Sequence, residues 1–338
     1  MRTNMISAVR RGLPPLLALL AACTGGTERE AARAPGGPAA SSGGAGAAAL
    51  VVFNAGSLAR PLRAALDTFA AREHVRIDQE SAGSLESARK LTELGKIPDV
   101  IALADWEVFP QLLVPEHVSW YVPFARNRMV VAYSDRSRHA GEIGTENWWR
   151  VLQRPDVEVG RADPNLDPNG YRTLLTLQLA ERHYRRPGLA ERLLARSPRR
   201  NMRPKEADLV GLLQAGELDY IWSYESIAQG AKLRYVRLPH EIDLGSPEDS
   251  ALYARASVRV AGRTPRDSVT FRGSPIVYAL SIPKGAPHPQ VAERFVAWLL
   301  GDGRAVLRAA RLDALEHPVV VGTGAPAAIT AAAPSGAR

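Results

Sequence analysis

Two short segments combine glycine with serine at the end of an extended stretch and the start of a predicted helix. Gly56 and Ser57 follow one predicted strand, and Gly83 and Ser84 follow the next. Backbone N–H groups in the first turn of a helix lack intrahelical partners, glycine lets a ligand approach the backbone, and a serine hydroxyl adds a donor. One such pair is typical of an ordinary helix cap. Two pairs at successive strand ends of one sheet predict an oxyanion site formed by neutral dipoles.

Two other segments place carboxylates at a turn and at a helix start. Asp167 lies in the stretch 163–172, where Pro, Asn and Gly residues precede a predicted helix that begins at Tyr171. Glu225 lies in the stretch 220–226, where a strand ends and a helix begins, so it meets the positive end of the helix dipole. Taken from local sequence alone, each carboxylate fits a capping role better than a ligand-binding role.

Alternating strands and helices must position these residues. Short extended runs alternate with segments whose apolar residues recur at helical spacing. The predicted strands cover 50–53, 76–78, 98–104, 129–133 and 276–282. The predicted helices include 58–69, 88–94, 148–152, 171–184, 209–213, 227–231 and 291–300. This alternation predicts an α/β fold with a parallel, doubly wound sheet that has helices on both faces.

The strand at 276–282 is expected to return the chain to its first part. Two lobes would then be joined by two crossover hinge strands, with a cleft between them. Two independent α/β domains are the alternative. The expected division gives lobe I residues 49–130 and 272–322, and lobe II residues 131–271.

The N-terminal segment has the pattern of a targeting signal. Residues 1–22 start with basic side chains and hold an apolar stretch from Leu13 that is too short to span a membrane. Small residues before Cys23 resemble a bacterial lipobox, which predicts signal cleavage and a lipid anchor on this cysteine. A secretory signal with an incidental cysteine is the alternative, and both predict export. Segments 23–48 and 323–338, poor in large apolar residues, predict a flexible tether and a disordered tail.

Composition excludes several function classes for this chain of 338 residues. The single cysteine rules out a disulfide framework and a cysteine-based zinc site. The formal charge of +8 includes three arginines of the N-terminal signal, and no long basic run is present, which argues against nucleic acid as a partner. The seven histidines show no paired spacing, and no G-x-S-x-G motif occurs, so a hydrolase is disfavoured.

Several of these segments together resemble one known family. The chain is similar to the tungstate/molybdate-binding proteins of the Wtp and Mod type through LVVFNAGSL, SAGSLESARKLTELGKIPDVIALADW, SWYVPFARNRMVVAYSD, ENWWRVLQRPDVEVGRADPNLDPNGYR and YIWSYESIA. The resemblance covers about 50–300 and implies the two-lobed, class II periplasmic-binding-protein fold. It also implies a monomeric, non-enzymatic protein that needs no cofactor and delivers its anion to an ABC permease and ATPase.

The resemblance assigns roles to individual residues of this chain. It implies that Ser57 and Ser84 donate to the oxygens of the anion, and that Gly56 and Gly83 permit the close approach. Tyr171 belongs to the same implied site.

Two carboxylates carry the most specific implication. The resemblance matches Asp167 and Glu225 to residues that bind the tungsten or molybdenum atom itself and raise its coordination from four to six. An ionised carboxylate repels an oxyanion, whereas a d⁰ metal accepts further hard oxygen ligands, so the pair would select against sulfate and phosphate. Asp163 is a lesser candidate. For Arg172, an ion pair that holds the turn is at least as plausible as a ligand contact.

Two positions depart from the family pattern, and two functional alternatives stay open. Asn169 stands where the family often has Cys, and Asn54 stands where it often has His. A sulfate, phosphate or other anion-binding protein of the same fold is one alternative function, and a membrane-tethered anion sensor is the other. The sequence does not separate tungstate from molybdate.

Overall fold

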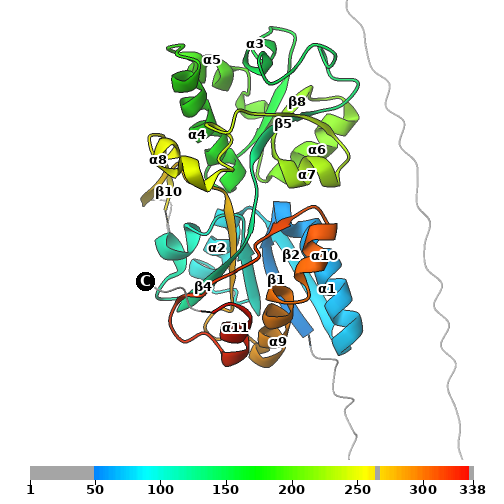
Figure 1. The fold of residues 1–338 in the computed structure, drawn as a ribbon, viewed down its shortest axis with the longest axis vertical. Coiled ribbons are helices and arrows are strands. Elements are labelled where there is room, and N and C mark those ends of the chain that lie inside the picture. Colours follow the sequence, from blue (N-terminus) through cyan, green and yellow to red (C-terminus); the bar gives the residue numbers. More distant parts are fainter. Residues whose placement is uncertain (1–48, 263–266, 335–338) are drawn as a thin grey trace, which may run out of the picture. The chain divides into compact units, whose positions relative to one another are not determined.

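The computed structural model of the protein describes residues 49–262 and 267–334. The predicted signal peptide at 1–22, the predicted lipid attachment at Cys23 and the remainder of the tether lie outside the described residues. The described part of the chain belongs to one compact unit that contains two main sheets (Figure 1).

The first sheet forms the core of lobe I. Its strands are ordered β13 (Asp313–Ala314), β4 (Trp120–Arg126), β12 (Val277–Ser281), β3 (Val100–Leu103), β1 (Ala49–Ala55) and β2 (Arg76–Ala82), with β14 (Val321–Gly322) paired to β4. Its helices are α1 (Ala59–Glu73), α2 (Ser84–Thr92), α9 (Pro289–Leu300), α10 (Arg304–Ala309) and α11 (Ala327–Ala332). The central strand β3 is buried along its whole length, which follows from its uninterrupted apolar sequence.

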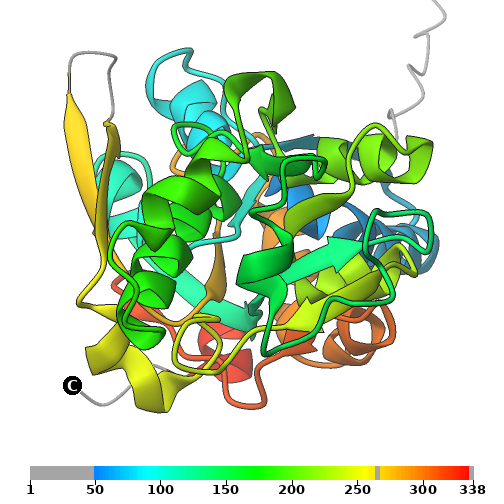
Figure 2. The same cartoon turned by 90° about the horizontal axis from the view of Figure 1, so that it is seen from above.

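The second sheet forms the core of lobe II. Its strands are ordered β7 (Met202–Arg203), β6 (Val159–Ala162), β8 (Tyr220–Tyr224), β5 (Met129–Tyr133) and β9 (Arg234–Arg237). Its helices are α3 (Trp148–Val151), α4 (Pro168–His183), α5 (Leu189–Ala195), α6 (Glu206–Ala215), α7 (Glu225–Gly230) and α8 (Ser250–Tyr253). A hairpin of β10 (Ser257–Ala261) and β11 (Ser268–Arg272) packs beside α4, and Figure 2 shows it in yellow along the edge of the molecule.

The α/β fold is confirmed, but the predicted parallel, doubly wound sheet is wrong, since both main sheets are mixed. β1 runs parallel to β2 and β3, whereas β12 runs antiparallel to both β3 and β4. In lobe II, β5 runs antiparallel to β8 and β9. The strands β12 and β5, which make these antiparallel pairs, are the ones at which the chain enters a sheet after crossing from the other lobe. Only the segments built as strand–helix–strand units give parallel neighbours.

Two chain crossings connect the lobes and contact each other. The first is the short link between β4 and β5, and the second includes the segments around residues 243–245 and 276. Met129 N–H donates to the Asp243 carbonyl at 2.7 Å, and Ile276 N–H donates to the Leu244 carbonyl at 2.8 Å. Asn127 N–H donates to the Ile276 carbonyl at 3.2 Å. These backbone bonds tie the crossings together, which is the arrangement expected of a hinge.

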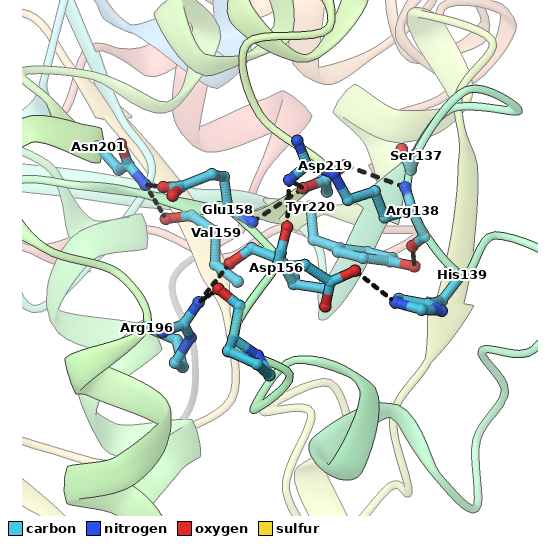
Figure 3. Close-up of polar contacts among 12 residues, drawn as sticks. Ser137, Arg138, His139, Asp156, Glu158, Val159, Arg196, Asn201, Asp219 and Tyr220 are labelled. Carbon is cyan, nitrogen blue, oxygen red and sulfur yellow. Dashed lines mark hydrogen bonds and ion pairs between the residues drawn. The ribbon is translucent and has the colours of Figure 1, made fainter.

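A carboxylate fixes the start of the central strands of lobe II (Figure 3). Asp219 Oδ1 accepts from the backbone N–H of Arg138 at 3.0 Å, and its Oδ2 accepts from the backbone N–H of Glu158 at 2.8 Å. The Arg138 guanidinium donates to the same carboxylate at 3.0 Å. Asp219 thereby joins the loop after β5 to the segments that enter β6 and β8.

The prediction of a disordered tail from residue 323 is wrong for the segment that forms α11. This helix packs against α9, and Ile329 is fully buried. The segment has few large apolar residues, but alanine favours the helix, and Ile329 and Ala333 are both fully buried against the core. Within the described residues, no helix has the length and apolar character needed to cross a membrane.

Candidate functional site

The two Gly-Ser pairs lie side by side at one edge of the first sheet. Ala55, the last residue of β1, is paired in parallel register with Ala82, the last residue of β2. Gly56 and Ser57 therefore begin a 3-10 turn next to the point where Ser84 begins α2. Both serines are buried. Ser84 Oγ accepts a hydrogen bond from the backbone N–H of Ala104 at 3.0 Å, which leaves its own proton free to donate.

Asp167 faces this edge from lobe II and caps helix α4. Its Oδ1 accepts from the backbone N–H of Asn169 at 2.9 Å, and its Oδ2 accepts from the backbone N–H of Glu206 at 3.1 Å. Asp167 is 4% exposed. The capping role read from local sequence is therefore present, and the same carboxylate also reaches a second helix, α6.

Glu206 is the carboxylate that accompanies Asp167. It is the first residue of α6 and is fully buried. Its Oε1 accepts from Ser223 Oγ and from the backbone N–H of Tyr224, both at 2.6 Å. Its Oε2 is buried and has no hydrogen-bond partner among the described residues. An unpartnered buried carboxylate oxygen is costly, and such atoms are characteristic of binding sites.

Burial disfavours the ionised forms of both carboxylates. Burial, followed by the neighbouring Asp167, raises the pKa of Glu206 to about 8. Burial also raises the pKa of Asp167 to about 6, although the N–H groups of Asn169 and Glu206 act in the opposite direction. The two groups therefore titrate as a coupled pair near neutral pH, and Glu206 holds its proton to a higher pH than Asp167 does.

A buried ion pair links the lobes beside these carboxylates. Arg172 Nη2 of α4 lies 3.1 Å from Asp105 Oδ2, in the loop after β3, and each side chain is at most 3% exposed. Arg172 Nη1 donates to the Ala104 carbonyl at 2.7 Å and to Tyr224 Oη at 2.8 Å. Arg172 thus forms an ion pair, but this pair joins the two lobes and does not hold the turn around Asp167.

Tyr171 is part of the same interlobe network. Its hydroxyl donates to Asp105 Oδ2, and its ring stacks on Phe271 of the hairpin with the centroids 4.6 Å apart. Burial and the nearby Asp105 raise the pKa of Tyr171, so the hydroxyl stays a donor at neutral pH. In this structure that donor is committed to Asp105.

Glu225 occupies a different environment from Asp167 and Glu206. It is the first residue of α7, and its carboxylate pairs with Arg128 at 3.2 Å and with Arg237 at 2.6 Å. Among the described residues, no hydrogen bond or ion pair joins Glu225 to Asp167. Asp163 also serves the turn, since its Oδ1 accepts from the backbone N–H of Asn165 at 2.8 Å.

Several buried polar atoms around the carboxylate pair have no hydrogen-bond partner within the described part of the chain. They are Ser57 Oγ, Asn169 Oδ1, Glu206 Oε2 and Arg172 Nη2, the last of which is engaged only in its ion pair. The site therefore combines a hydroxyl and a guanidinium nitrogen, which can donate, with amide and carboxylate oxygens, which accept. It suits a small oxyanion whose central atom accepts oxygen ligands. No cluster of three or more metal-ligating side chains occurs among the residues that the structure describes.

Sequence reasoning missed Glu206 and Asp105, although each has a local signal that could have marked it. Glu206 follows Pro204 and Lys205 at the start of a helix, which is the same local signal that marks Glu225. Asp105 follows β3, as the Gly-Ser pairs follow β1 and β2, so its place at a strand end was a usable signal.

Comparison with known proteins identifies the class of this protein. The family model of the bacterial extracellular solute-binding proteins matches residues 50–310, and the chain belongs to this family. It is therefore an extracytoplasmic solute-binding protein and not an enzyme.

Two relatives match this chain over most of its length. A solute-binding protein of Petrotoga mobilis is 44% identical over 260 residues, covering 76% of this chain and 81% of the relative. The molybdate/tungstate-binding protein WtpA of Pyrococcus abyssi is 34% identical over 332 residues, covering 90% of this chain and 92% of the relative.

Two solved structures show the same fold at low sequence identity. The periplasmic molybdate-binding protein of Azotobacter vinelandii has a TM-score of 0.56 at 16% identity, covering 78% of this chain and 98% of that chain. The sulfate-binding protein SubI of Mycobacterium tuberculosis has a TM-score of 0.57 at 14% identity, covering 84% of this chain and 90% of that chain. The two-lobed periplasmic-binding-protein fold is thereby established.

Replacement of Glu206 by glutamine should stabilise the unliganded protein at neutral pH. The unfolded chain ionises this group near its ordinary pKa of 4.5, whereas the folded pKa is about 8, so folding becomes less favourable as pH rises between these values. The amide oxygen of the introduced glutamine would still accept from Ser223 and Tyr224. We expect Glu206→Gln to increase the free energy of unfolding by about 4 kcal/mol near pH 7.5, and to have little effect near pH 4.

Denaturant unfolding at both pH values measures this difference, and Glu225→Gln is the matched control. The control loses two ion pairs on a partly exposed side chain, so its stability should be unchanged or slightly reduced. Equal effects of the two substitutions at neutral pH would contradict the proposed burial cost of Glu206.

Proposed function

We propose that this protein binds tungstate or molybdate between its lobes and delivers the anion to the permease and ATPase of an ABC importer. The observation that carries the proposal is the buried carboxylate pair Asp167 and Glu206 beside two serine-bearing helix starts. The relative from Pyrococcus abyssi, whose name states molybdate and tungstate binding, supports the same ligand class.

The presence of carboxylates in a site for an oxyanion needs a physical explanation, because both carry negative charge. Ionised carboxylates repel sulfate and phosphate and have no proton to donate to them. Molybdenum and tungsten in their d⁰ oxyanions accept additional hard oxygen ligands, an option that sulfur and phosphorus lack. Once both groups are ionised, the buried pair therefore coordinates the metal centre of one class of anion and repels the other class.

The proposed roles differ from the sequence assignment at one position. Ser57 and Ser84 donate to the oxygens of the anion, and Gly56 and Gly83 allow the backbone to come close. Asp167 supplies one metal ligand.

We assign the second metal ligand to Glu206 in place of Glu225. Glu206 contacts Asp167 through its own backbone N–H, and it has an unpartnered oxygen. Glu225 instead pairs with Arg128 and Arg237, and it has no hydrogen bond or ion pair to Asp167 within the described residues.

The interlobe contacts explain how such a site could retain its ligand. Leu85 and Glu86 of lobe I donate backbone hydrogen bonds to the Leu166 carbonyl of lobe II at 3.1 and 3.3 Å. The Arg172–Asp105 ion pair lies beside them in the fold. Opening the cleft breaks these contacts, so ligand affinity for the closed form shifts the population toward closure.

We also propose that the chain is exported and anchored through a lipid on Cys23. This rests on the lipobox-like sequence before Cys23 and on the polar tether after it. The body of the protein would work as a monomer at the outer surface of the membrane. The mass of the N-terminal peptide of the mature protein tests the anchor, because an unmodified residue 23 would refute it.

Titration calorimetry with four anions tests the proposed function. We expect tight binding of tungstate and molybdate, about −12 kcal/mol if the affinity is nanomolar, and no measurable heat from sulfate or phosphate. Glu206→Gln should weaken tungstate binding by at least about 100-fold, because glutamine cannot lose a proton to become an anionic oxygen ligand, and Glu225→Gln should have less than about a threefold effect. A wild-type preference for sulfate or phosphate would refute the carboxylate-ligated site and favour the alternative anion-binding function.

A further inference from the structure

The cleft between the lobes has one edge that is closed by backbone contacts. At the start of α2, a Cβ atom on Gly83 would lie 2.1 Å from the Leu166 carbonyl oxygen, so the two lobes touch without room for a methyl group. Arg89 of the same helix donates to the Asn165 carbonyl at 2.8 Å and to the Ala261 carbonyl at 2.6 Å. An anion has no path through this edge while these contacts are formed.

A different edge is formed by α1, α6, α7 and α10, which lie on the same side of the molecule in Figure 1. A cavity of about 500 Å³ lies between these helices. Gly56 and Ser57 line it, and so does Ala207, which follows Glu206 in α6. The cavity therefore reaches the elements that form the proposed anion site. Its charged lining residues are Arg60, Lys232 and Arg311, and no acidic side chain lines it.

A second cavity of about 360 Å³ extends the first toward the hinge. The two share Ser226, Gln229 and Arg311. The second cavity is lined by the cations Arg126, Arg128, Arg308 and Arg311, and by the acids Glu225 and Asp313. It therefore carries an excess of positive charge.

The arginines of the second cavity differ in how far they are neutralised. Arg128 lies 3.2 Å from Glu225 and 3.5 Å from Asp243. Arg126 and Arg311 make no side-chain hydrogen bond or ion pair within the described residues. Neither guanidinium group is therefore held in an ion pair, and Arg126 lies opposite Asp313 in the pairing of β4 with β13.

We propose that these connected cavities are the entry path of the anion, and that Arg126 and Arg311 capture it before it reaches Ser57. The proposal rests on the proposed function, because it concerns the route to the same site. A cleft lined by one sign of charge with low-dielectric walls concentrates counter-ions and raises association rates by about 10- to 1,000-fold. The alanine-rich walls of the first cavity offer an anion few competing partners, so it moves on to the donors at the inner end.

If the two arginines steer the anion, their removal should lower its association rate constant and leave its dissociation rate constant unchanged. Arg311 lies at the junction of the two cavities, outside the carboxylate pair. The double variant Arg126→Gln/Arg311→Gln should reduce the association rate constant of molybdate about fivefold to tenfold at low ionic strength. The difference should fall below about twofold near 0.5 M salt, and the dissociation rate constant should stay within about twofold of the wild type.

Rapid filtration with radiolabelled molybdate at nanomolar concentration measures both rate constants on the full protein. The matched control is Arg199→Gln/Arg255→Gln, which removes the same charge from two exposed arginines that do not line either cavity. Arg126→Lys/Arg311→Lys should restore the association rate, since it restores the charge.

Two results would overturn the entry path. One is an equal association rate constant in the cavity variant and its control. The other is a loss of affinity that arises mainly from faster dissociation. A wild-type protein that binds no molybdate in the same assay would refute the proposed function itself, which is a distinguishable outcome.

Discussion

Two carboxylates held out of water form the constraint on which the rest of this structure depends. Asp167 and Glu206 are far apart in sequence, yet each is fixed by backbone N–H groups at a helix start, and one of those groups belongs to Glu206 itself. Burial of like charges opposes folding, and nothing in the packing of the two sheets requires it. Such an arrangement is retained where a ligand uses the carboxylate oxygens, so metal coordination explains a feature that selection for stability alone would remove.

The lobes are positioned so that this pair meets donors from the opposite sheet. Parallel register between β1 and β2 brings the two Gly-Ser pairs together, and the absent Cβ of Gly83 lets α2 approach the loop before Asp167. The Arg172–Asp105 ion pair then joins the lobes within hydrogen-bonding reach of Tyr171 and Tyr224. The opposite edge of the cleft stays open, with cationic side chains at its rim. One edge of the cleft therefore holds the lobes together, and the opposite edge admits the anion.

Local sequence predicted the parts of this site that depend on local rules. Glycine and serine at strand ends, and Asp167 as a helix cap, follow from backbone requirements within a few residues. Glu206 and Glu225 have the same local signature, an acid at a helix start. Their difference arises from distant residues, because Asp167 and Ser223 enclose one, whereas Arg128 and Arg237 pair with the other. The mixed strand directions and the docking of α11 through Ile329 likewise depend on chain crossings and tertiary contacts that periodicity does not report.

The central claim is that Asp167 and Glu206 bind the metal atom of the anion and do more than surround its oxygens. X-ray absorption at the tungsten edge of the tungstate-loaded protein tests this most directly. The account predicts six oxygen neighbours around tungsten, with two longer bonds from the protein, and loss of one of these in Glu206→Gln but not in Glu225→Gln. Four equivalent oxygen neighbours, as in the free tetrahedral anion, would contradict metal coordination by this pair.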